Sequence, residues 1–318
     1  MGRSHLEQLG GQVATRIPRD ADGYIDRECP SGSCSKEFKL LPGTGLSAQS
    51  TGFCPYCGHG AEPSQFTTKS QRNFALADAR AKLIEAHRKD LRAMVNSVNS
   101  HTSSGGFISM RMELRSTPIP RNSYSHKDLE TNIVCPSCDL HYAIYGKFAF
   151  CPDCGKHNST QMLDVNLGLV ERQLVLAAIA GDQDLERHLI ENSLEDAVSA
   201  FDGFGRELVR VKATALGHPS KADGFSFQSL TAAEKRLLKE FSVSLKALFD
   251  NGDFDFVVTM FLRRHVFAHS MGVVDSDYAA RSGDPTAIVG RRLRVEPTEV
   301  RRLVAILKGV AQRLEQTL

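Results

Sequence analysis

The chain has 318 residues, of which 41 % are hydrophobic and 24 % charged, and its formal net charge at pH 7 is +2. This composition is ordinary for a soluble globular protein, and the length suits two domains. The longest purely apolar run, residues 174–180, is far shorter than the roughly 20 residues that span a bilayer. The N-terminus is polar and lacks the apolar segment of a signal peptide. We therefore expect a cytoplasmic protein that does not associate with membranes.

The two halves of the chain differ in charge and in cysteine content. Residues 1–158 hold 19 Lys and Arg against 15 Asp and Glu, and residues 159–318 hold 20 against 22. Neither half is polybasic, so contact with nucleic acid would have to come from local patches. All eight cysteines fall within residues 29–154 and occur in pairs. Paired cysteines in a chain without a secretion signal are typical of metal ligands.

Residues 24–62 are predicted to form a first zinc ribbon. Four residues separate Cys29 from Cys34, whereas Cys54 and Cys57 have the regular C-P-x-C-G form. Turns that contain glycine and proline let thiolates and backbone N–H groups converge on one ion. His59 follows this second pair closely, and His157 likewise follows the last cysteine of the chain, Cys154. Because four cysteines already complete each site, we expect both histidines at the surface or behind the ligands.

Residues 68–100 are predicted to form a connecting helix, because apolar residues recur there at steps of three and four (residues 76, 83, 84, 91, 94, 95 and 98). The other face carries seven Lys and Arg against three Asp and Glu. This face is either the solvated side of a docking helix or a strip that contacts the phosphates of nucleic acid.

Residues 107–158 are predicted to contain a strand followed by a second zinc ribbon. A linker covers residues 101–106, residues 108–114 alternate apolar and polar as a strand does, and residues 118–128 form a connector. The second ribbon has the spacing C-x2-C-x12-C-x2-C, and we expect a hairpin that turns at Gly146. The segments FCPYCGHG and FCPDCGKH repeat one another, which indicates two copies of one module with four ligands in the second copy (Cys135, Cys138, Cys151 and Cys154).

Four thiolates make a closed tetrahedral metal site without an open position for water. We therefore expect two structural zinc ions per chain, which would support modules that have few apolar residues. A redox or iron–sulfur role is the alternative. Aromatic and basic residues near the second ribbon could stack on the bases of a single strand, or they could form the ribbon's own core (Tyr142, Tyr145, Lys147, Phe148, Lys156 and His157).

Residues 160–318 are predicted to form an all-α domain, since the pattern stays helical apart from two loops at 217–226 and 275–296. The fold class is thus multidomain and mainly α, with two small β zinc ribbons at the N-terminal side. One apolar helix begins near Phe254 and ends before Gly272, a residue type that commonly follows a helix end. Arg264 and His269 near its end form an R-x4-H element.

This stretch resembles the HEPN superfamily, all-α domains whose signature R-x4-6-H lies near a helix end. The downstream segments VVDSDYAARSGDP and IVGRRLRV and the upstream segment LEDAVSAFDGFGREL are similar to one bacterial subgroup of unknown or defence-related role. The resemblance covers about residues 160–318. It implies a HEPN-like helical bundle with metal-independent endoribonuclease activity on RNA. It also implies a homodimer in which two R-x4-H elements share a cleft, and a toxin or antiviral defence setting.

RNA cleavage by its own 2′-hydroxyl needs a base, an acid and a cation that stabilises the phosphate. Histidine titrates near neutrality, and arginine presents a planar fork to phosphate oxygens. The resemblance makes Arg264 the phosphate-binding cation, His269 the proton-transfer group and His265 the residue that orients the site, with Arg263 as an additional candidate. On an ideal helix, Arg264 and His269 lie about 140° apart. Either the helix end unwinds before Gly272, or the site is composite.

Other interpretations of the same residues stay open. Cationic side chains complement the dipole at a helix C-terminus for structural reasons. His265 and His269 have the i, i+4 spacing of metal ligands, although no acidic third ligand is placed nearby on that face. At the level of function, the alternative is an inactive HEPN domain in a zinc-ribbon adaptor that binds nucleic acid or a partner protein. A weaker third option is a transcription-linked regulator whose ribbons bind DNA.

Overall fold

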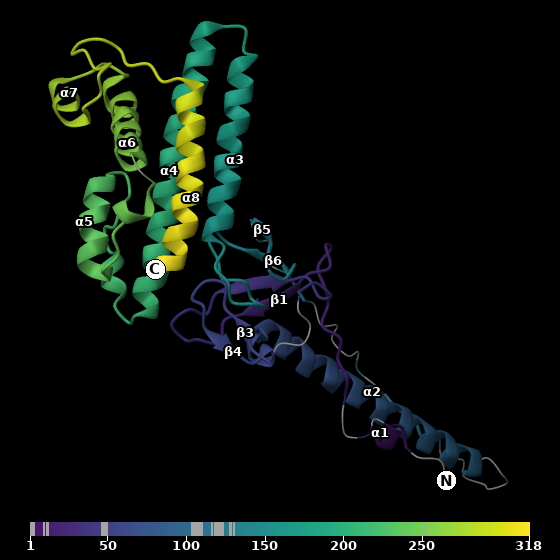
Figure 1. The fold of residues 1–318 in the computed structure, drawn as a ribbon. Helices are drawn as coiled ribbons and strands as arrows, with labels where there is room; N and C mark the ends of the chain where they lie inside the picture. Colours follow the sequence, from purple (N-terminus) through teal and green to yellow (C-terminus); the bar gives the residue numbers. More distant parts are fainter. Residues whose placement is uncertain are drawn as a thin grey trace. The chain divides into compact units, whose positions relative to one another are not determined.

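The computed structural model describes residues 4–8, 10, 13–45, 50–102, 111–115, 117, 124–126, 129, 131–250 and 252–318. The chain divides into two compact units, Met1–Lys156 and His157–Leu318, which are described separately (Figure 1). Helices are the predominant elements, in agreement with the predicted mainly-α class. Among the helices of the described ranges, none combines the length and apolar character needed to cross a membrane.

Unit 1 is built on a four-stranded antiparallel sheet in the order β1-β2-β6-β5. The first cysteine pair of each ribbon lies in the turn between two paired strands (β1, Ile25–Glu28, and β2, Glu37–Leu40; β5, Thr131–Val134, and β6, His141–Ile144). The hairpin of the second ribbon therefore turns at Cys135–Cys138, and the predicted turn at Gly146 is wrong. The cysteine turn reverses the chain before the second strand begins, and Gly146 lies in a bend after β6 with φ of +98°.

The two ribbons are related by an approximate two-fold axis. The pair Ile25 and Leu40 in the first ribbon corresponds to Thr131 and Ile144 in the second. Strands β2 and β6 pair with each other, and the axis passes between two equivalent residues, Lys39 and Ala143. The sequence predicted two modules, and the structure joins them in one sheet.

The second cysteine pairs are held by reciprocal contacts between the ribbons. In the first ribbon this pair is flanked by the short strands β3 (Gly52–Phe53) and β4 (Gly60–Ala61). A Cβ added to Gly58 would lie 3.2 Å from the Phe150 ring, and one added to Gly155 would lie 3.2 Å from the Phe53 ring. The backbone N–H of each phenylalanine donates to a proline carbonyl of the other ribbon at 2.8 Å (Phe53 to Pro152, and Phe150 to Pro55). Each ribbon thus completes the packing of the other.

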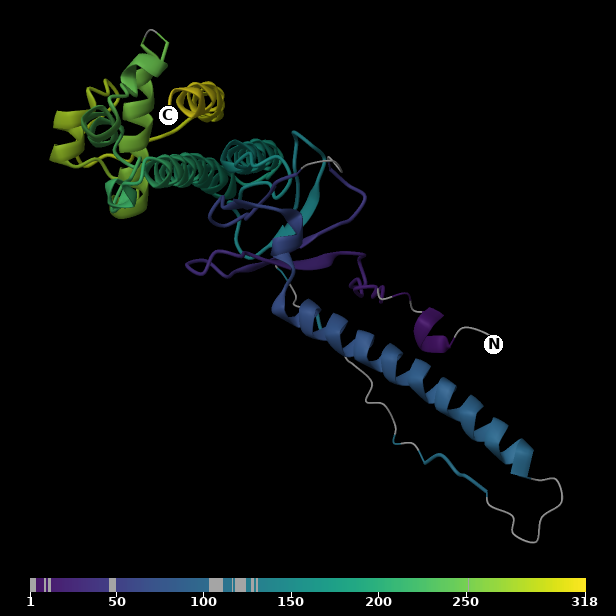
Figure 2. The ribbon, with the colours of Figure 1, turned by 90° about the horizontal axis from the view of Figure 1, so that it is seen from below.

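The predicted connecting helix is α2, Lys69–Thr102, which follows a 3₁₀ turn η1 at Pro63–Phe66 (Figure 2). Thr68 and Gln71 exchange backbone-to-side-chain hydrogen bonds of 3.0 and 3.1 Å at its start, as in a capping box. The short helix α1, His5–Gln8, contacts it through Asp90. Several apolar side chains of α2 are exposed, so the predicted docking face has little cover from the described part of unit 1 (Leu76, Leu83, Ile84 and Met94).

The predicted strand before the second ribbon is not found in the part of it that the structure describes. Residues 111–115 have no regular secondary structure, and residues 107–110 lie outside the described residues, as do 103–106 of the predicted linker. Within the second ribbon, Tyr142 is almost fully buried and belongs to the ribbon core, whereas Tyr145 is exposed. The core interpretation therefore holds for Tyr142.

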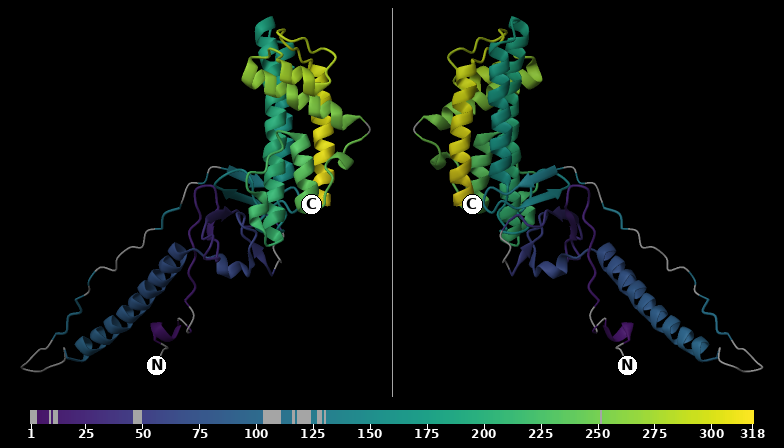
Figure 3. Two further views of the ribbon diagram at one scale, coloured as in Figure 1. Left: turned by 90° about the vertical axis from the view of Figure 1, so that its left-hand side faces the viewer. Right: turned by 90° about the vertical axis from the view of Figure 1, so that its right-hand side faces the viewer.

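In unit 2, three long helices run side by side, α3 (Ser159–Ala178), α4 (Gln183–Ala215) and α8 (Pro297–Thr317) (Figure 3). The remaining elements pack against α4, α8 or each other (η2, Pro219–Ala222; α5, Leu230–Phe241; η3, Lys246–Leu248; α6, Asp253–Ser270; α7, Ser276–Ser282). The expected helices are confirmed, and the predicted loops contain η2 and α7.

An aromatic cluster in unit 2 depends on one glycine of α4. A Cβ on Gly205 would lie 2.4 Å from the ring of Phe227, so only glycine leaves room for that ring. Phe227 stacks edge-on against Phe201, and Phe201 does the same against Phe261 of α6. The FDGFG segment of α4 therefore packs against both the loop before α5 and the helix α6, which carries the R-x4-H element.

Candidate functional site

The eight cysteines form two groups of four, each matching one predicted ligand set. Within each group the Sγ atoms all lie within 4.8 Å of one another, and the shortest separations are 3.5–3.8 Å. Four sulfurs at about 2.3 Å from a tetrahedral ion are about 3.8 Å apart. Both groups therefore fit a four-coordinate metal ion.

Burial raises the pKa of the Cys54 and Cys151 thiols. Thiolates in such surroundings need a positive partner, which a bound cation supplies. Neither histidine near the knuckles belongs to a cysteine group: His59 is exposed, and His157 Nε2 lies 3.1 Å from Glu207 Oε1 in unit 2. The expectation that these histidines are not ligands agrees with the geometry of the two groups.

Arg263, the additional candidate from sequence, is engaged in a buried ion-pair network. Its Nε donates to Asp284 Oδ2 at 2.8 Å, and its Nη1 donates to Glu299 Oε1 at 2.9 Å. Tyr278 donates its hydroxyl to the same Asp284 oxygen at 2.7 Å. Burial alone would raise the pKa of the Asp284 carboxyl, but hydrogen bonds from Arg263, Thr286 and Tyr278 hold it well below its usual range. Arg263 thus ties α6 to the loop after α7 and to α8.

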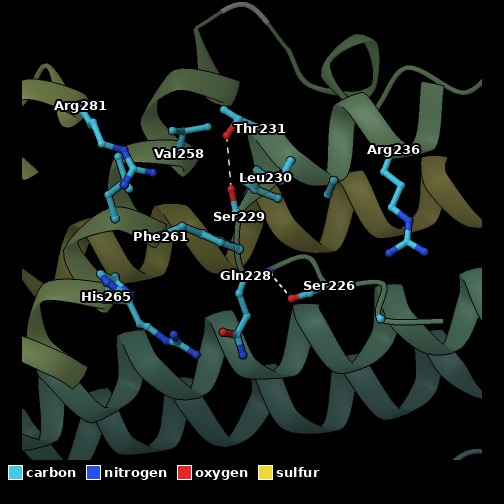
Figure 4. Close-up of a pocket in the computed structure, with 15 residues that line it drawn as sticks. Ser226, Gln228, Ser229, Leu230, Thr231, Arg236, Val258, Phe261, His265 and Arg281 are labelled. Carbon is cyan, nitrogen blue, oxygen red and sulfur yellow. Dashed lines mark hydrogen bonds between the residues drawn. The ribbon is translucent and has the colours of Figure 1, made fainter. Parts of the chain in front are cut away.

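Arg264 has the opposite surroundings. Its side chain is buried, with the residue only 8 % exposed, and its Nε has no hydrogen-bond partner among the described residues. It lines a cavity of about 570 Å³ between α6, α5 and the loop before α5 (Figure 4). A buried guanidinium without an acceptor is costly, so its presence here marks a place where a ligand could supply one.

The cavity is shaped by contacts that begin on α4. Buried Asp202 accepts hydrogen bonds from the Phe227 N–H at 2.6 Å and from the Ser226 hydroxyl at 3.0 Å. These bonds hold the loop whose residues Gln228 and Ser229 face the cavity in Figure 4. The same loop leads into the N-terminus of α5, so α4 determines where that helix end lies.

The two histidines of α6 are both exposed, but they differ in their relation to the cavity. His265 lines the cavity together with Arg264, whereas His269 lies outside the set of described lining residues. The two imidazole rings contact each other, with centroids 4.5 Å apart. Helix α6 continues through Ser270 and ends in two left-handed residues, Met271 and Gly272. Of the two alternatives from the sequence, unwinding of the helix end does not occur between Arg264 and His269, which both project from a regular helix.

Exposed apolar side chains lie on the segments that follow His269. The backbone of residues 272–274 is hydrogen-bonded to residues 290–293 through three bonds of 2.8–2.9 Å. These two segments and their flanks carry four large apolar residues that are 42–82 % exposed (Met271, Val273, Ile288 and Val289). We call these four residues the α6-end patch. Apolar groups exposed together are typical of surfaces that bind another protein.

Several residues of the cavity were not singled out in the sequence. Arg236 comes from α5 and Arg281 from α7, and both line the cavity together with Arg264. The sequence SLTAAEKRLL has the form of a helix start and could have located α5. It does not indicate that the N-terminus of this helix lies at the same cavity as Arg264. No protein-family model, curated protein or solved structure matches this chain.

Proposed function

We propose that this chain is a metal-independent endoribonuclease of the HEPN type, active in the cytoplasm as a homodimer, in a toxin or antiviral defence role. The observation that carries the proposal is the buried Arg264, whose Nε has no hydrogen-bond partner in the described part of the chain and which lines a cavity together with His265 on the helix that bears the R-x4-H element. In this proposal the cysteine groups hold structural zinc, and the ribbons bind RNA or a protein partner.

The proposed reaction uses the RNA's own 2′-hydroxyl. An imidazole takes the proton from the 2′-oxygen, which then attacks the adjacent phosphorus, and the bond from phosphorus to the 5′-oxygen breaks. The leaving 5′-oxygen receives a proton from an imidazolium, so the products are a 2′,3′-cyclic phosphate and a 5′-hydroxyl. The Arg264 guanidinium stabilises the negative charge that grows on the phosphate. His265 and His269 are the two imidazoles available on α6.

A homodimer is supported by the position of His269. Within one protomer this side chain lies outside the cavity that holds Arg264, so a composite site would bring it to the cavity of a second copy. The α6-end patch begins two residues after His269 and offers an apolar surface for such a contact. A two-fold axis at this patch would place both α6 C-termini at one interface.

A non-catalytic adaptor is the second candidate, and one observation favours it. The cavity joins Arg264 to His265 and leaves His269 out, which is sufficient for binding phosphate but provides one imidazole per protomer. Such a chain would bind RNA or a phosphorylated partner without cutting it.

Cleavage of RNA by the purified full-length protein in EDTA separates the two candidates. We expect cleavage that survives brief chelation, ends with 2′,3′-cyclic phosphate, and fails when the sugar at the cut position lacks its 2′-hydroxyl. Arg264→Ala and His269→Ala should each reduce the cleavage rate by about 10² or more. The double variant should be little slower than either single variant, because residues that act as one catalytic unit lose most of their effect when the first is removed. His265→Ala tests whether the cavity histidine transfers a proton or only orients the site.

Exposed residues elsewhere in unit 2 provide matched controls. Arg301→Ala and His218→Ala remove the same groups at solvent-exposed positions that do not line the cavity. Both should keep the wild-type rate. Immediate loss of activity in EDTA, normal cleavage of the deoxy substrate, or full activity of His269→Ala would each exclude this mechanism. RNA binding without any cleavage by the wild-type protein would favour the adaptor.

A further inference from the structure

The cavity beside Arg264 has an unusual balance of charge. Three arginines and one histidine are among the described residues that line it, and none of those lining residues is acidic. The Nη2 of Arg236 donates to two backbone carbonyls, at 2.6 Å to Asp223 and 3.1 Å to Lys221, so no carboxylate neutralises its charge. In Figure 4, Arg236 lies at one side of the cavity and Arg281 and His265 lie at the other. Arg281 pairs with Asp277 Oδ2 at 2.9 Å, so its charge is partly neutralised. The cavity therefore attracts anions chiefly near Arg264 and Arg236, which have no carboxylate partner among the described residues.

The N-terminus of α5 forms another wall of the cavity. Residues 229–233 line it, and the side chain of the capping residue Ser229 accepts no hydrogen bond from the first-turn N–H groups, since its hydroxyl lies 3.3 Å from the Thr231 hydroxyl instead. The first intrahelical bond runs from the Ala233 N–H to the Ser229 carbonyl, so the N–H groups of residues 230–232 have no acceptor among the described residues. Free amides and the positive end of the helix dipole together favour an anion at this position.

Arg264 provides an observation independent of the helix end. It is more than nine-tenths buried, it lines the same cavity from the opposite element, and its Nε has no acceptor among the described residues. Val258, Phe261 and Leu262 of α6 add an apolar wall beside it. A cavity of about 570 Å³ has the volume of a typical small-molecule site.

We propose that this cavity binds a phosphate monoester between the Arg264 guanidinium and the free amides of α5. Arginine forks and helix N-termini both suit phosphate oxygens, and the charges of Arg264 and Arg236 together with the helix end favour a dianion over a singly charged diester. The ligand is either inorganic phosphate or a nucleoside monophosphate, whose nucleoside would lie on the apolar wall. The inference deepens the proposed function, because Arg264 serves both, and it makes such anions competitors of RNA at this site.

The test is titration of the full-length protein with inorganic phosphate and, separately, with a nucleoside 3′-monophosphate, by calorimetry. We expect both to bind, and Arg264→Gln to weaken binding by about tenfold to a hundredfold, the worth of a charge-assisted hydrogen bond. Arg236→Gln and Arg281→Gln, at more exposed positions, should weaken binding while unit 2 stays folded by circular dichroism. Arg301→Gln is the matched control and should bind as wild type does. Tighter binding of the monophosphate than of inorganic phosphate would identify the nucleotide as the ligand, and equal binding would identify phosphate itself.

Absence of binding by either anion, or unchanged binding by the Arg236 and Arg281 variants in folded protein, would overturn the proposal. The two hypotheses fail separately. If RNA is cleaved but neither anion binds, the phosphate-site proposal is wrong and the nuclease proposal stands. If an anion binds but RNA is not cleaved, the nuclease proposal is wrong and the phosphate-site proposal stands.

Discussion

Arg263 and Arg264 are neighbours in the chain, yet their guanidinium groups have opposite environments. Arg263 is neutralised by Asp284 and Glu299, whereas the Arg264 Nε has no partner among the described residues. Adjacent residues on a helix point about 100° apart, so one faces the interior between α6, α7 and α8 and the other faces the cavity. The first arginine therefore serves stability, and the second is available for a ligand.

We expect Arg263→Ala to destabilise the protein by about 3–5 kcal/mol, since it leaves the buried Asp284 carboxylate without its cation. Denaturant unfolding followed by circular dichroism measures this. Arg301→Ala removes an exposed arginine 3.5 Å from Glu171 and should cost about 1 kcal/mol or less. Equal losses in the two variants would show that the Arg263 network contributes little.

Glu207 should make unit 2 sensitive to acid. Burial alone would raise its pKa, but hydrogen bonds from Arg210 and His157 lower the pKa to about 2 from an ordinary 4.5. A carboxyl with a depressed folded-state pKa contributes stability above pH 4.5 that is lost as pH falls towards 2, here as much as about 3 kcal/mol. Glu207→Gln should flatten the fall in unfolding free energy between pH 5 and 3. The exposed Glu186 on the same helix is the control, and a fall as steep in Glu207→Gln as in wild type would refute the assignment.

At the scale of elements, the hydrogen-bonded segments after α6 determine which side chains lie next to His269. They bring residues 271–274 beside residues 290–293, and the α6-end patch results. Periodicity could predict α6 and its end, because those depend on residues a few positions apart. The cavity depends on Arg236 and Arg281, which are 28 and 17 residues from Arg264 in the chain. Nothing local to Arg264 encodes that proximity.

Charge placed in the α6-end patch should separate the protomers. We expect Met271→Asp and Val289→Asp to weaken self-association by at least about tenfold, because each would bury an unpaired carboxylate at the interface. Light scattering over a range of concentrations measures the change, and RNA cleavage should fall with it. Leu238→Asp alters an exposed apolar residue of α5 and should leave association unchanged. A wild-type protein that is monomeric and fully active at micromolar concentration would contradict the composite site.

At the scale of the whole molecule, cysteine spacing predicted both ligand groups, because each group forms mostly from close pairs. It could not predict that β2 pairs with β6, since a short alternating strand does not specify a partner about 100 residues away. The prediction of a hairpin turn at Gly146 was wrong for a related reason. A glycine bend and a cysteine turn can both reverse the chain direction, and the sequence does not show which of the two joins the paired strands.

We expect two zinc ions per chain, measured by elemental analysis of freshly purified protein. Cys151→Ser should remove the second ion and also weaken the first by about tenfold or more. The reason is that the Phe150 ring would no longer be held against Gly58 in the first ribbon. The circular dichroism of unit 2 should persist. Ser33→Ala, in the first cysteine turn, is the control. An unchanged affinity of the first site in Cys151→Ser would show that the ribbons are independent.

The pairing of β2 with β6 also sets an order of events during folding. Each cysteine group closes a loop of 19 or 28 residues, whereas β2–β6 pairing closes one of about 100. A loop about four to five times longer costs about 1.2–1.5 kcal/mol more in chain entropy, so we expect the local closures to precede the pairing. During synthesis, the first ribbon emerges about 100 residues before its counterpart. Until then the edge of β2 and the face of Phe53 that packs on Gly155 lack their partners in the nascent chain, and we expect ion binding at the first cysteine group to stabilise this half until the other half is made.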